Sequence, residues 1–328
     1  MAERVNREGL SASAAGPIAY RSGSVGDRVR QLVWFDRSGN ELEKVGDTSV
    51  ALASPSLSPD GRRLAGFRTG ISNFDIWLLD LGRTVPSRFT LTDARDEVNP
   101  VWSPDGRRIV FLSRGRDDAA DLYMKSATGE GKEEPLLVTG ADKTPVDWSP
   151  DGRFVLYENS DPPPAKKWGD LWAVPVDGDR KPFPVFASPN FQEQNGQFSP
   201  DGKWIAYESD ESGTVEIYLQ PFRGSGSKTH VSTRGGAQVR WRGDGKELFY
   251  IALDERLMAV PIRLPSNGGT VEIGSPVPLF TTHVGGAVQS PLPSQYVVSP
   301  DGQRFLMSTV APEAASPITV ILNWKPKP

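Results

Sequence analysis

The stretch Ser103-Pro104-Asp105-Gly106-Arg107-Arg108-Ile109-Val110-Phe111-Leu112-Ser113 decides the fold, because its first four residues return along the chain. Pro fixes φ, Asp accepts hydrogen bonds from the amides that follow it, and Gly tolerates a positive φ, so the tetrapeptide predicts a hairpin turn. The apolar residues after it predict a strand. Further copies are Ser58–Gly61, Ser149–Gly152, Ser199–Gly202 and Ser299–Gly302, with a degenerate copy at Arg242–Gly245. We interpret the turn aspartates as structural rather than as cation ligands.

The copies recur at the period of a four-stranded propeller blade. The turn aspartates lie at positions 60, 105, 151, 201, 244 and 301, a spacing typical of such blades. A more degenerate seventh copy of the motif is visible at Ser13–Gly16, and the strand-like segment Ile18–Ser22 follows it. Because one sheet cannot bury both of its faces alone, the copies should stack around an axis. We therefore expect one all-β domain over residues 1–328, a seven-bladed β-propeller of four-stranded antiparallel blades.

The two ends of the chain predict how the ring closes. The last copy supplies inner strands near residues 296–299 and 304–308 and a third strand at Ile318–Trp324, so that an outer strand is missing. Residues 1–6 are expected to fill this gap and so remove a frayed edge. The alternative is a six-bladed propeller with residues 1–46 as an appendage.

Composition excludes several classes of site. A formal net charge of -4 argues against a nucleic-acid partner, because such binding depends on neutralising phosphates. The absence of cysteine excludes disulfides, Cys-ligated metals and thiol catalysis. His230 and His283 lack metal-ligating spacing, so we expect no metal and no cofactor. The sequence as given shows neither a signal peptide nor an apolar stretch long enough to cross a membrane.

The repeat resembles the WD-like repeat of TolB-type propellers over nearly the whole chain. The motif is Ser-Pro-Asp-Gly-Arg with an apolar strand, followed by segments such as Asp75–Trp77 or Asp121–Tyr123. The segments Leu32–Gly39 and Ile318–Trp324 further resemble propeller regions attached to bacterial serine/threonine protein kinases. This resemblance implies a sensory or scaffolding module beside a kinase, although the chain itself contains no kinase motif. It leaves localisation open: cytoplasmic if the chain is complete, extracytoplasmic if it was cut from a membrane-anchored receptor kinase.

The inner strands predict a polar central channel. Side chains of a strand alternate between its two faces, so alternate inner-strand residues pack between blades while the others face the channel. Asp147 and Arg240 would then bring opposite charges into a hydrated channel, a lining that is also usual in propellers that bind nothing there. The expected channel-lining residues are Asn99, Asp147, Asn195, Gln197, Gln238, Arg240 and Gln295.

The loops that lead into the inner strands open on the face opposite the Pro-Asp-Gly turns, which we call the loop face. Aromatic and arginine side chains there are typical of recognition surfaces. A triple proline at Pro162–Pro164 stiffens one of these loops. The residues expected to bind a partner on this face are Arg95, Asp96, Lys143, Trp168, Phe191, Gln192, Glu193, Arg234 and His283.

These observations predict a non-catalytic scaffold or sensory module that binds a protein or peptide through the loop face. The chain contains no Gly-x-Ser-x-Gly nucleophile motif, and we assign no catalytic residue. Two alternatives stay open. One is a lyase or glycosidase at the channel mouth that pairs carboxylates such as Asp96, Glu97, Asp142 and Glu193. The other is a small-ligand or cation sensor in the channel.

Overall fold

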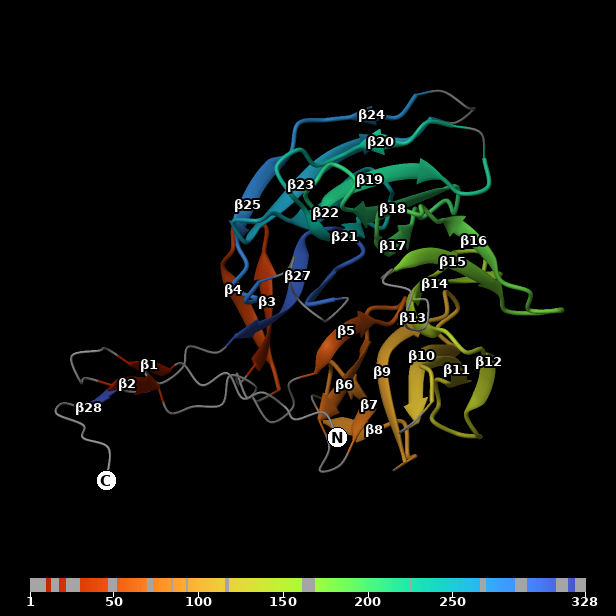
Figure 1. Cartoon of the computed structure of the whole chain (residues 1–328), viewed down its shortest axis with the longest axis horizontal. Helices are drawn as coiled ribbons and strands as arrows, with labels where there is room; N and C mark the ends of the chain where they lie inside the picture. The colour runs from red at the N-terminus through yellow and green to blue at the C-terminus, as the bar shows by residue number, and fades with distance from the viewer. Residues whose placement is uncertain are drawn as a thin grey trace.

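The chain folds into sheets arranged around a central axis (Figure 1). The computed structural model describes residues 10–12, 18–21, 30–46, 52–69, 73–83, 85–92, 94–115, 118–160, 169–224, 226–265, 270–286, 294–310 and 318–321. Across these residues the secondary structure consists of strands and turns, without a helix. Each inner strand contacts the inner strand of the next blade, and the last contacts the first, so that the ring is closed. The expected all-β propeller is confirmed.

The first three blades follow the chain from the inner strand outward, each strand pairing antiparallel with the next. The first contains β5 (Ala53–Leu57), β6 (Arg63–Thr69), β7 (Phe74–Asp80) and β8 (Pro86–Arg88). The second contains β9 (Arg95–Trp102), β10 (Arg108–Gly115), β11 (Asp121–Ser126) and β12 (Glu134–Leu137). The third contains β13 (Asp142–Trp148), β14 (Phe154–Ser160), β15 (Asp170–Pro175) and β16 (Phe183–Phe186).

The remaining blades complete the ring. The fourth contains β17 (Glu193–Phe198), β18 (Trp204–Ser209), β19 (Glu216–Pro221) and β20 (Thr229–His230). The fifth contains β21 (Ala237–Trp241), β22 (Glu247–Ile251) and β23 (Arg256–Arg263), with β24 (Glu272–Ile273) and β25 (Val277–Thr281) both paired to β23. The sixth joins β26 (Tyr296–Val298) and β27 (Arg304–Val310) to β3 (Arg30–Asp36) and β4 (Glu41–Val45).

The propeller has six blades, so the expectation of seven was wrong. The sixth blade takes its inner strands from the end of the chain and its outer strands from residues 30–45, which are therefore not an appendage either. Strand β27 pairs with β3 along its whole length, from Arg304 opposite Asp36 to Val310 opposite Arg30. This pairing buries Leu32 and Phe35 in the clusters on either side of the blade. The apolar run of β3 is thus the third strand of the closing blade.

The segments that suggested a seventh blade pair elsewhere. Strands β1 (Leu10–Ala12), β2 (Ile18–Arg21) and β28 (Ile318–Ile321) form a three-stranded sheet with one another rather than joining a blade. Residues 318–321 therefore do not supply the third strand of the last copy, and residues 322–324 lie outside the described residues. Residues 1–6 and 13–16 lie outside the described residues. The described part of the chain offers no helix with the length and apolarity needed to cross a membrane.

The Ser-Pro-Asp-Gly turns form the hydrogen bonds that their sequence predicts. In the second blade, Ser103 Oγ donates to Asp105 Oδ1 over 2.5 Å, and the backbone N–H of Arg107 donates to the same carboxylate oxygen over 3.0 Å. The backbone N–H of Arg108 donates to Ser103 Oγ over 2.9 Å, and Gly106 adopts a φ of 68°. The hydrogen bond from Ser103 lowers the pKa of Asp105. The same bonds recur at the other Ser-Pro-Asp-Gly turns.

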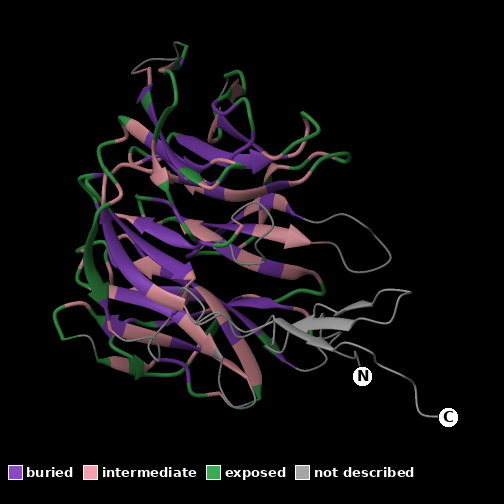
Figure 2. Cartoon of the chain, turned by 90° about the vertical axis from the view of Figure 1, so that its left-hand side faces the viewer, coloured by how far each residue is buried: buried purple, intermediate pink, exposed green. Residues whose placement is uncertain are grey.

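The hydrophobic core lies between the blades. Strands carry alternating side chains, so each sheet buries one row against the preceding blade and the other against the following blade. In one cluster Val110 and Leu122 of the second blade pack with Trp148 and Tyr157 of the third. Burial follows the strands around the described part of the ring, while the connecting turns and loops are exposed (Figure 2). This packing leaves the inner edges of the blades to form the wall of the central channel.

Candidate functional site

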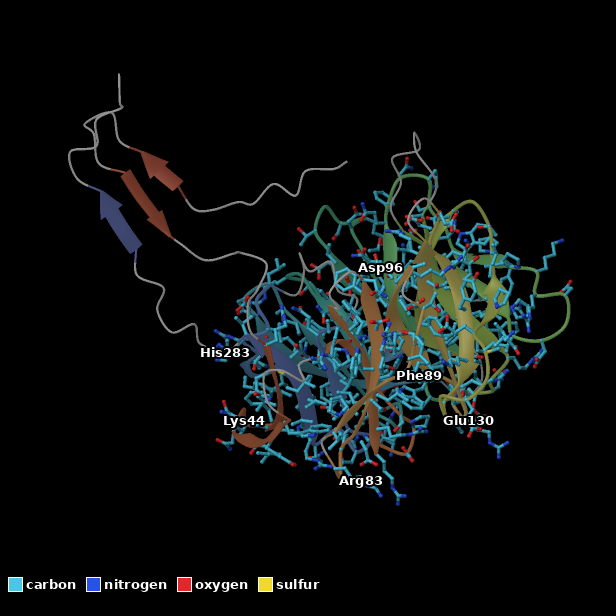
Figure 3. The ribbon with its side chains drawn as sticks, turned by 90° about the horizontal axis from the view of Figure 1, so that it is seen from below. Lys44, Arg83, Phe89, Asp96, Glu130 and His283 are labelled. Carbon is cyan, nitrogen blue, oxygen red and sulfur yellow. The ribbon has the colours of Figure 1, made fainter. Side chains whose placement is uncertain are left out.

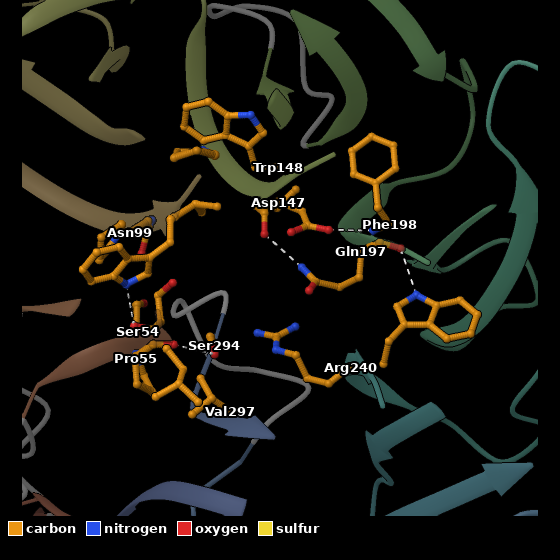
Figure 4. Close-up of a pocket in the computed structure, with 18 of the residues that line it drawn as sticks. Ser54, Pro55, Asn99, Asp147, Trp148, Gln197, Phe198, Arg240, Ser294 and Val297 are labelled. Atoms are coloured by element: carbon orange, nitrogen blue, oxygen red, sulfur yellow. Dashed lines mark hydrogen bonds between the residues drawn. The ribbon is translucent and has the colours of Figure 1, made fainter. Parts of the chain in front are cut away.

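A cavity of about 400 Å³ occupies the centre of the ring at the end where the Pro-Asp-Gly turns lie. The prolines of three of these turns, Pro59, Pro104 and Pro150, are among its lining residues, which places its opening on the turn face. Its wall combines aromatic rings of Trp102, Trp148, Phe198 and Trp241 with polar inner-strand side chains. Several of those side chains point toward its centre (Figure 4). A concave site with a few convergent polar groups is the usual form of a ligand pocket.

Irregular inner strands direct polar residues into this wall. The register between the first two strands shifts in five of the blades, including the shift between Gln194 and Gln197. Near these shifts Ser54, Asn99 and Asn195 adopt positive φ values of 47°, 55° and 51°. Positive φ is uncommon for residues other than glycine, and bulges of this kind serve to redirect side chains. The sequence pattern placed polar residues here but gave no sign of the bulge.

Two polar atoms of the cavity wall have no hydrogen-bond partner in the described structure. Ser54 Oγ and Asn99 Oδ1 are both inaccessible to solvent and unpaired. Ser54 is only 4% exposed, and both residues line the cavity. An unpaired buried polar atom costs about 1–3 kcal/mol, so these two atoms are unfavourably buried behind the cavity wall, and a bound group reaches them only when the side chains rotate.

Asp147 and Arg240 form the charged part of the wall. Asp147 Oδ2 accepts a hydrogen bond from the backbone N–H of Phe198 over 2.6 Å. Burial raises the pKa of Asp147 to about 7, opposed by the hydrogen bond from Phe198 and by the positive charge of Arg240. Arg240 Nη1 donates to the carbonyl oxygen of Val239 over 2.7 Å, and its guanidinium lies 5.8 Å from the centre of the Tyr296 ring. Burial lowers the pKa of Arg240.

Two glutamates beside the channel, the half-buried Glu158 and the buried Glu208, were missed by the sequence analysis. Glu158 Oε1 accepts a hydrogen bond from the backbone N–H of Asn195 over 2.7 Å. Glu208 Oε1 accepts hydrogen bonds from Asn195 Nδ2 over 2.8 Å and from the backbone N–H of Gln238 over 2.5 Å. Burial raises the pKa of each glutamate to about 7.

A signal for these glutamates was present in the sequence. The same position of the second strand holds Phe67, Leu112 and Ile251 in three other blades. The sixth blade holds Ser308 there, so Glu158 and Glu208 place a carboxylate where three of the other four blades have an apolar residue. Each glutamate joins its own blade to the bulge of the next.

The residues expected in the channel separate into two groups. Asn99, Asp147, Asn195, Gln197 and Arg240 line the cavity. Gln238 and Gln295 are each 1% exposed and lie outside its lining. Gln238 Nε2 donates to Gln295 Oε1 over 2.7 Å, and the Gln295 backbone N–H donates to Gln238 Oε1 over 2.7 Å. This pair connects the inner strands of the fifth and sixth blades.

Two residues expected on the loop face are buried instead. Lys143 is 1% exposed, and its ammonium donates to Asp121 Oδ1 over 2.8 Å, so it holds two strands together and is not available to a partner. Glu193 is 5% exposed, and its Oε2 accepts a hydrogen bond from the backbone N–H of Ser188 over 3.2 Å. Lys143 is the second residue of β13 and Glu193 the first of β17, where the preceding blade contacts them.

The other residues of this group differ in exposure. Arg95 lies 5.2 Å from the centre of the Tyr123 ring, and Asp96 accepts a hydrogen bond from the backbone N–H of Phe74, so both are partly engaged (Figure 3 labels Asp96). Four further residues expected on the loop face are partly or fully exposed: Phe191, Gln192, Arg234 and His283. Trp168 and the triple proline lie outside the described residues.

The carboxylates considered for catalysis are engaged in the fold. Asp142 accepts hydrogen bonds from Arg114 and from the backbone N–H of Ala120. Glu97 is fully buried, and burial raises its pKa to about 8, with further contributions from Glu133 and Asp75 and opposition from Thr90 and Arg95. Within the described ranges, no group of three or more His, Asp or Glu residues is arranged to hold a metal ion.

Part of the sequence matches a known family. Residues 18–166 match the family model of the TolB beta propeller domain. The uncharacterized peptidase YuxL of Bacillus subtilis is 34% identical over 116 residues, which cover 33% of this chain and 17% of that protein. The Tol-Pal system protein TolB of Francisella tularensis subsp. mediasiatica is 22% identical over 208 residues, which cover 62% of this chain and 46% of that protein. The matched segments thus span less than half the length of these curated relatives.

Solved structures show the same fold over most of the chain. A structure assigned as TolB from Agrobacterium tumefaciens has a TM-score of 0.64 at 20% identity, covering 86% of this chain and 98% of that chain. Other structures with this fold are enzymes, among them prolyl endopeptidases and an oligogalacturonate lyase in complex with manganese. The low identities limit these likenesses to the fold. The chain is therefore a β-propeller with a TolB-like repeat fold.

Proposed function

We propose that this protein is a non-catalytic interaction module that binds a segment of a protein or peptide in the central cavity on the turn face. The observation that carries the proposal is the cavity of about 400 Å³, in which Ser54 Oγ and Asn99 Oδ1 have no partner. A bound segment that donates hydrogen bonds to these atoms, once the Ser54 and Asn99 side chains rotate toward the cavity, would relieve their unfavourable burial. The aromatic rings of the wall supply apolar contact area around these polar groups.

The cavity is a better candidate than the loop face that the sequence favoured. Lys143 and Glu193 are unavailable there, which removes charged groups from the expected surface. The exposed Phe191 and Arg234 support the loop face as a second candidate surface, because aromatic and arginine side chains often anchor partners. Both candidates place the protein in the same class, a propeller that recognises another polypeptide.

An enzymatic function has weaker support. A glycosidase or lyase that pairs two carboxylates needs both within reach of one bond. Among the described residues that line the cavity, Asp147 is the only carboxylate, and Glu158 and Glu208 accept hydrogen bonds from backbone groups of the next blade. The peptidase and lyase names of some similar proteins describe those proteins.

A role as the sensory part of a kinase is a further element of this proposal. It is supported by the resemblance of Leu32–Gly39 and Ile318–Trp324 to kinase-attached propellers. The structure gives these two segments different places, since Arg30–Asp36 belongs to the closing blade and Ile318–Ile321 to the separate sheet. Reading the complete gene around the segment that encodes this chain would test this role, and a gene without a kinase domain would reject it.

The binding site can be tested by selecting random displayed peptides on the immobilised protein and measuring the affinity of the enriched sequences by calorimetry. The cavity variant Gln197→Ala/Arg240→Ala should lower the affinity at least tenfold. The matched loop-face variant Phe191→Ala/Arg234→Ala should leave it unchanged, and both should keep the wild-type circular dichroism spectrum. The reverse pattern would assign binding to the loop face, and failure to enrich any peptide would count against the proposed function.

A further inference from the structure

The guanidinium of Arg240 has unused hydrogen-bonding capacity inside the cavity. It points toward the cavity centre (Figure 4). A guanidinium carries five N–H donors in a planar arrangement that matches a carboxylate. Its hydrogen bond within the described structure is the one from Nη1 to Val239, while Asp147 and Glu208 act on it by their charge. The remaining donors are therefore available to an anionic group in the cavity.

Hydrogen-bond acceptors lie on the other parts of the same wall. Ser54 and Asn99 belong to the first two blades, across the cavity from Arg240 of the fifth (Figure 4). Asn99 Oδ1 can only accept a hydrogen bond, and Ser54 Oγ can accept or donate one. Asp147 of the third blade adds a carboxyl group. A ligand that satisfies the whole wall must carry an anionic group and, a short distance away, N–H or O–H donors.

The last residue of a polypeptide has this combination, because it carries a free carboxylate beside a backbone N–H. We propose that the cavity recognises the C-terminal carboxylate of a peptide, with the carboxylate bound by Arg240 and backbone N–H groups of the peptide donating to Asp147 and, after rotation of its side chain, to Asn99. This assignment rests on the proposed function and specifies which part of the partner enters the cavity.

The charge of the surroundings disfavours a dianion more strongly than a monovalent anion. Asp147 lines the cavity, and Glu158 and Glu208 lie beside the channel, so a group with two negative charges would be repelled by several neighbours. A single carboxylate can be neutralised by one guanidinium. Burial lowers the pKa of Arg240, and an ion pair with a bound carboxylate would offset that effect. The cavity volume of about 400 Å³ suits a few residues rather than a folded domain.

The test uses two synthetic pentapeptide libraries of identical random composition, one with free C-terminal acids and one with C-terminal amides. Each library is passed over the immobilised full chain, and peptides retained are identified by mass spectrometry and measured by calorimetry. We expect acids to be enriched and amidation of an enriched peptide to lower its affinity at least tenfold. Arg240→Gln should remove the preference for the acid, while Arg240→Lys should keep part of it.

Arg83→Gln is the matched control, since it neutralises an exposed arginine outside the cavity lining and should keep the full preference. Equal binding of acids and amides to the wild-type protein would overturn the carboxylate assignment while peptide binding itself stood. Retention of neither library would reject both this assignment and the proposed function. If free amino acids bound as tightly as the pentapeptides, the proposal that the carboxylate belongs to a peptide would be overturned. The same carboxylate chemistry would then belong to a small molecule.

Discussion

The side chain of Glu158 in β14 accepts a hydrogen bond from the backbone N–H of Asn195 in β17 over 2.7 Å. The two residues belong to neighbouring blades, and Asn195 lies at an inner-strand bulge with a φ of 51°. The N–H group that the bulge removes from regular strand pairing thus finds its acceptor in the preceding blade. Glu208 plays the same part for the bulge at Gln238. These contacts fix one blade to the next around the cavity.

Replacing Glu158 by Ala should lower the free energy of unfolding by about 1–2 kcal/mol, because the N–H of Asn195 would lose its acceptor. Glu158→Gln keeps an oxygen in this position and should cost less. Chemical denaturation of the two variants at pH 6 measures the difference. If the alanine variant were as stable as the glutamine variant, the hydrogen bond between the blades would contribute nothing to the free energy of unfolding.

Glu97 should make the protein less stable as the pH rises. Burial raises its pKa to about 8 from an ordinary 4.5, so the folded state holds the proton more tightly than the unfolded state. The contribution of protonated Glu97 to the free energy of unfolding is fully present below about pH 4.5, and it is lost as the pH rises through about 8. At about 1.4 kcal/mol per pKa unit, the loss amounts to a few kcal/mol.

Glu97→Gln should therefore raise the melting temperature at pH 8.5 and change it little at pH 4.5. The control Glu43→Gln alters an exposed residue of β4 and should have no such effect. Melting curves recorded by differential scanning fluorimetry at both pH values make the comparison. A Glu97→Gln protein that follows the wild-type pH dependence would exclude Glu97 as its source.

Ser103→Ala should destabilise the protein by about 1–2 kcal/mol, since Ser103 Oγ donates to Asp105 and accepts from the backbone N–H of Arg108. The pKa of Asp105 should rise toward its ordinary value, because its lowering depends first on the Ser103 hydrogen bond. Nuclear magnetic resonance titration of the carboxyl carbon reports this pKa. Ser87→Ala, at an exposed position of β8, serves as the control; an unchanged Asp105 titration would refute the role of the serine.

Closure of the ring by the N-terminal strands predicts a large cost for Leu32→Ala. Leu32 lies in β3, is 0% exposed and packs with Leu64 and Leu306, so its truncation should cost about 2–5 kcal/mol. Leu42→Ala in the neighbouring strand β4 removes a side chain that is 51% exposed and should change stability by less than about 0.5 kcal/mol. Urea denaturation of both variants measures these changes in the free energy of unfolding. Similar small losses in the two variants would contradict closure of the ring by β3.

Residues close together in the chain were the ones that the sequence described well. Each turn depends on contacts such as Ser103 with Asp105, which lie two positions apart, and the alternation after each turn gives the strands. The polar wall of the channel followed from the same alternation, with Asn99, Asp147 and Arg240 among its residues. The separation of Gln238 and Gln295 from the cavity did not, because their side chains are held in mutual hydrogen bonds between the fifth and sixth blades, a contact between residues 57 positions apart.

The sequence by itself determined the repeating unit, the all-β class and the structural role of the turn aspartates, because local backbone preferences and strand periodicity are sufficient for these. Only the tertiary structure decided that six blades close the ring, that β3 and β4 complete the last of them, and that Lys143 is buried. Each of these depends on pairing between segments far apart in the chain, such as Arg304–Val310 with Arg30–Asp36. Such pairing is selected by the packing of the whole ring, and no short stretch of sequence encodes it.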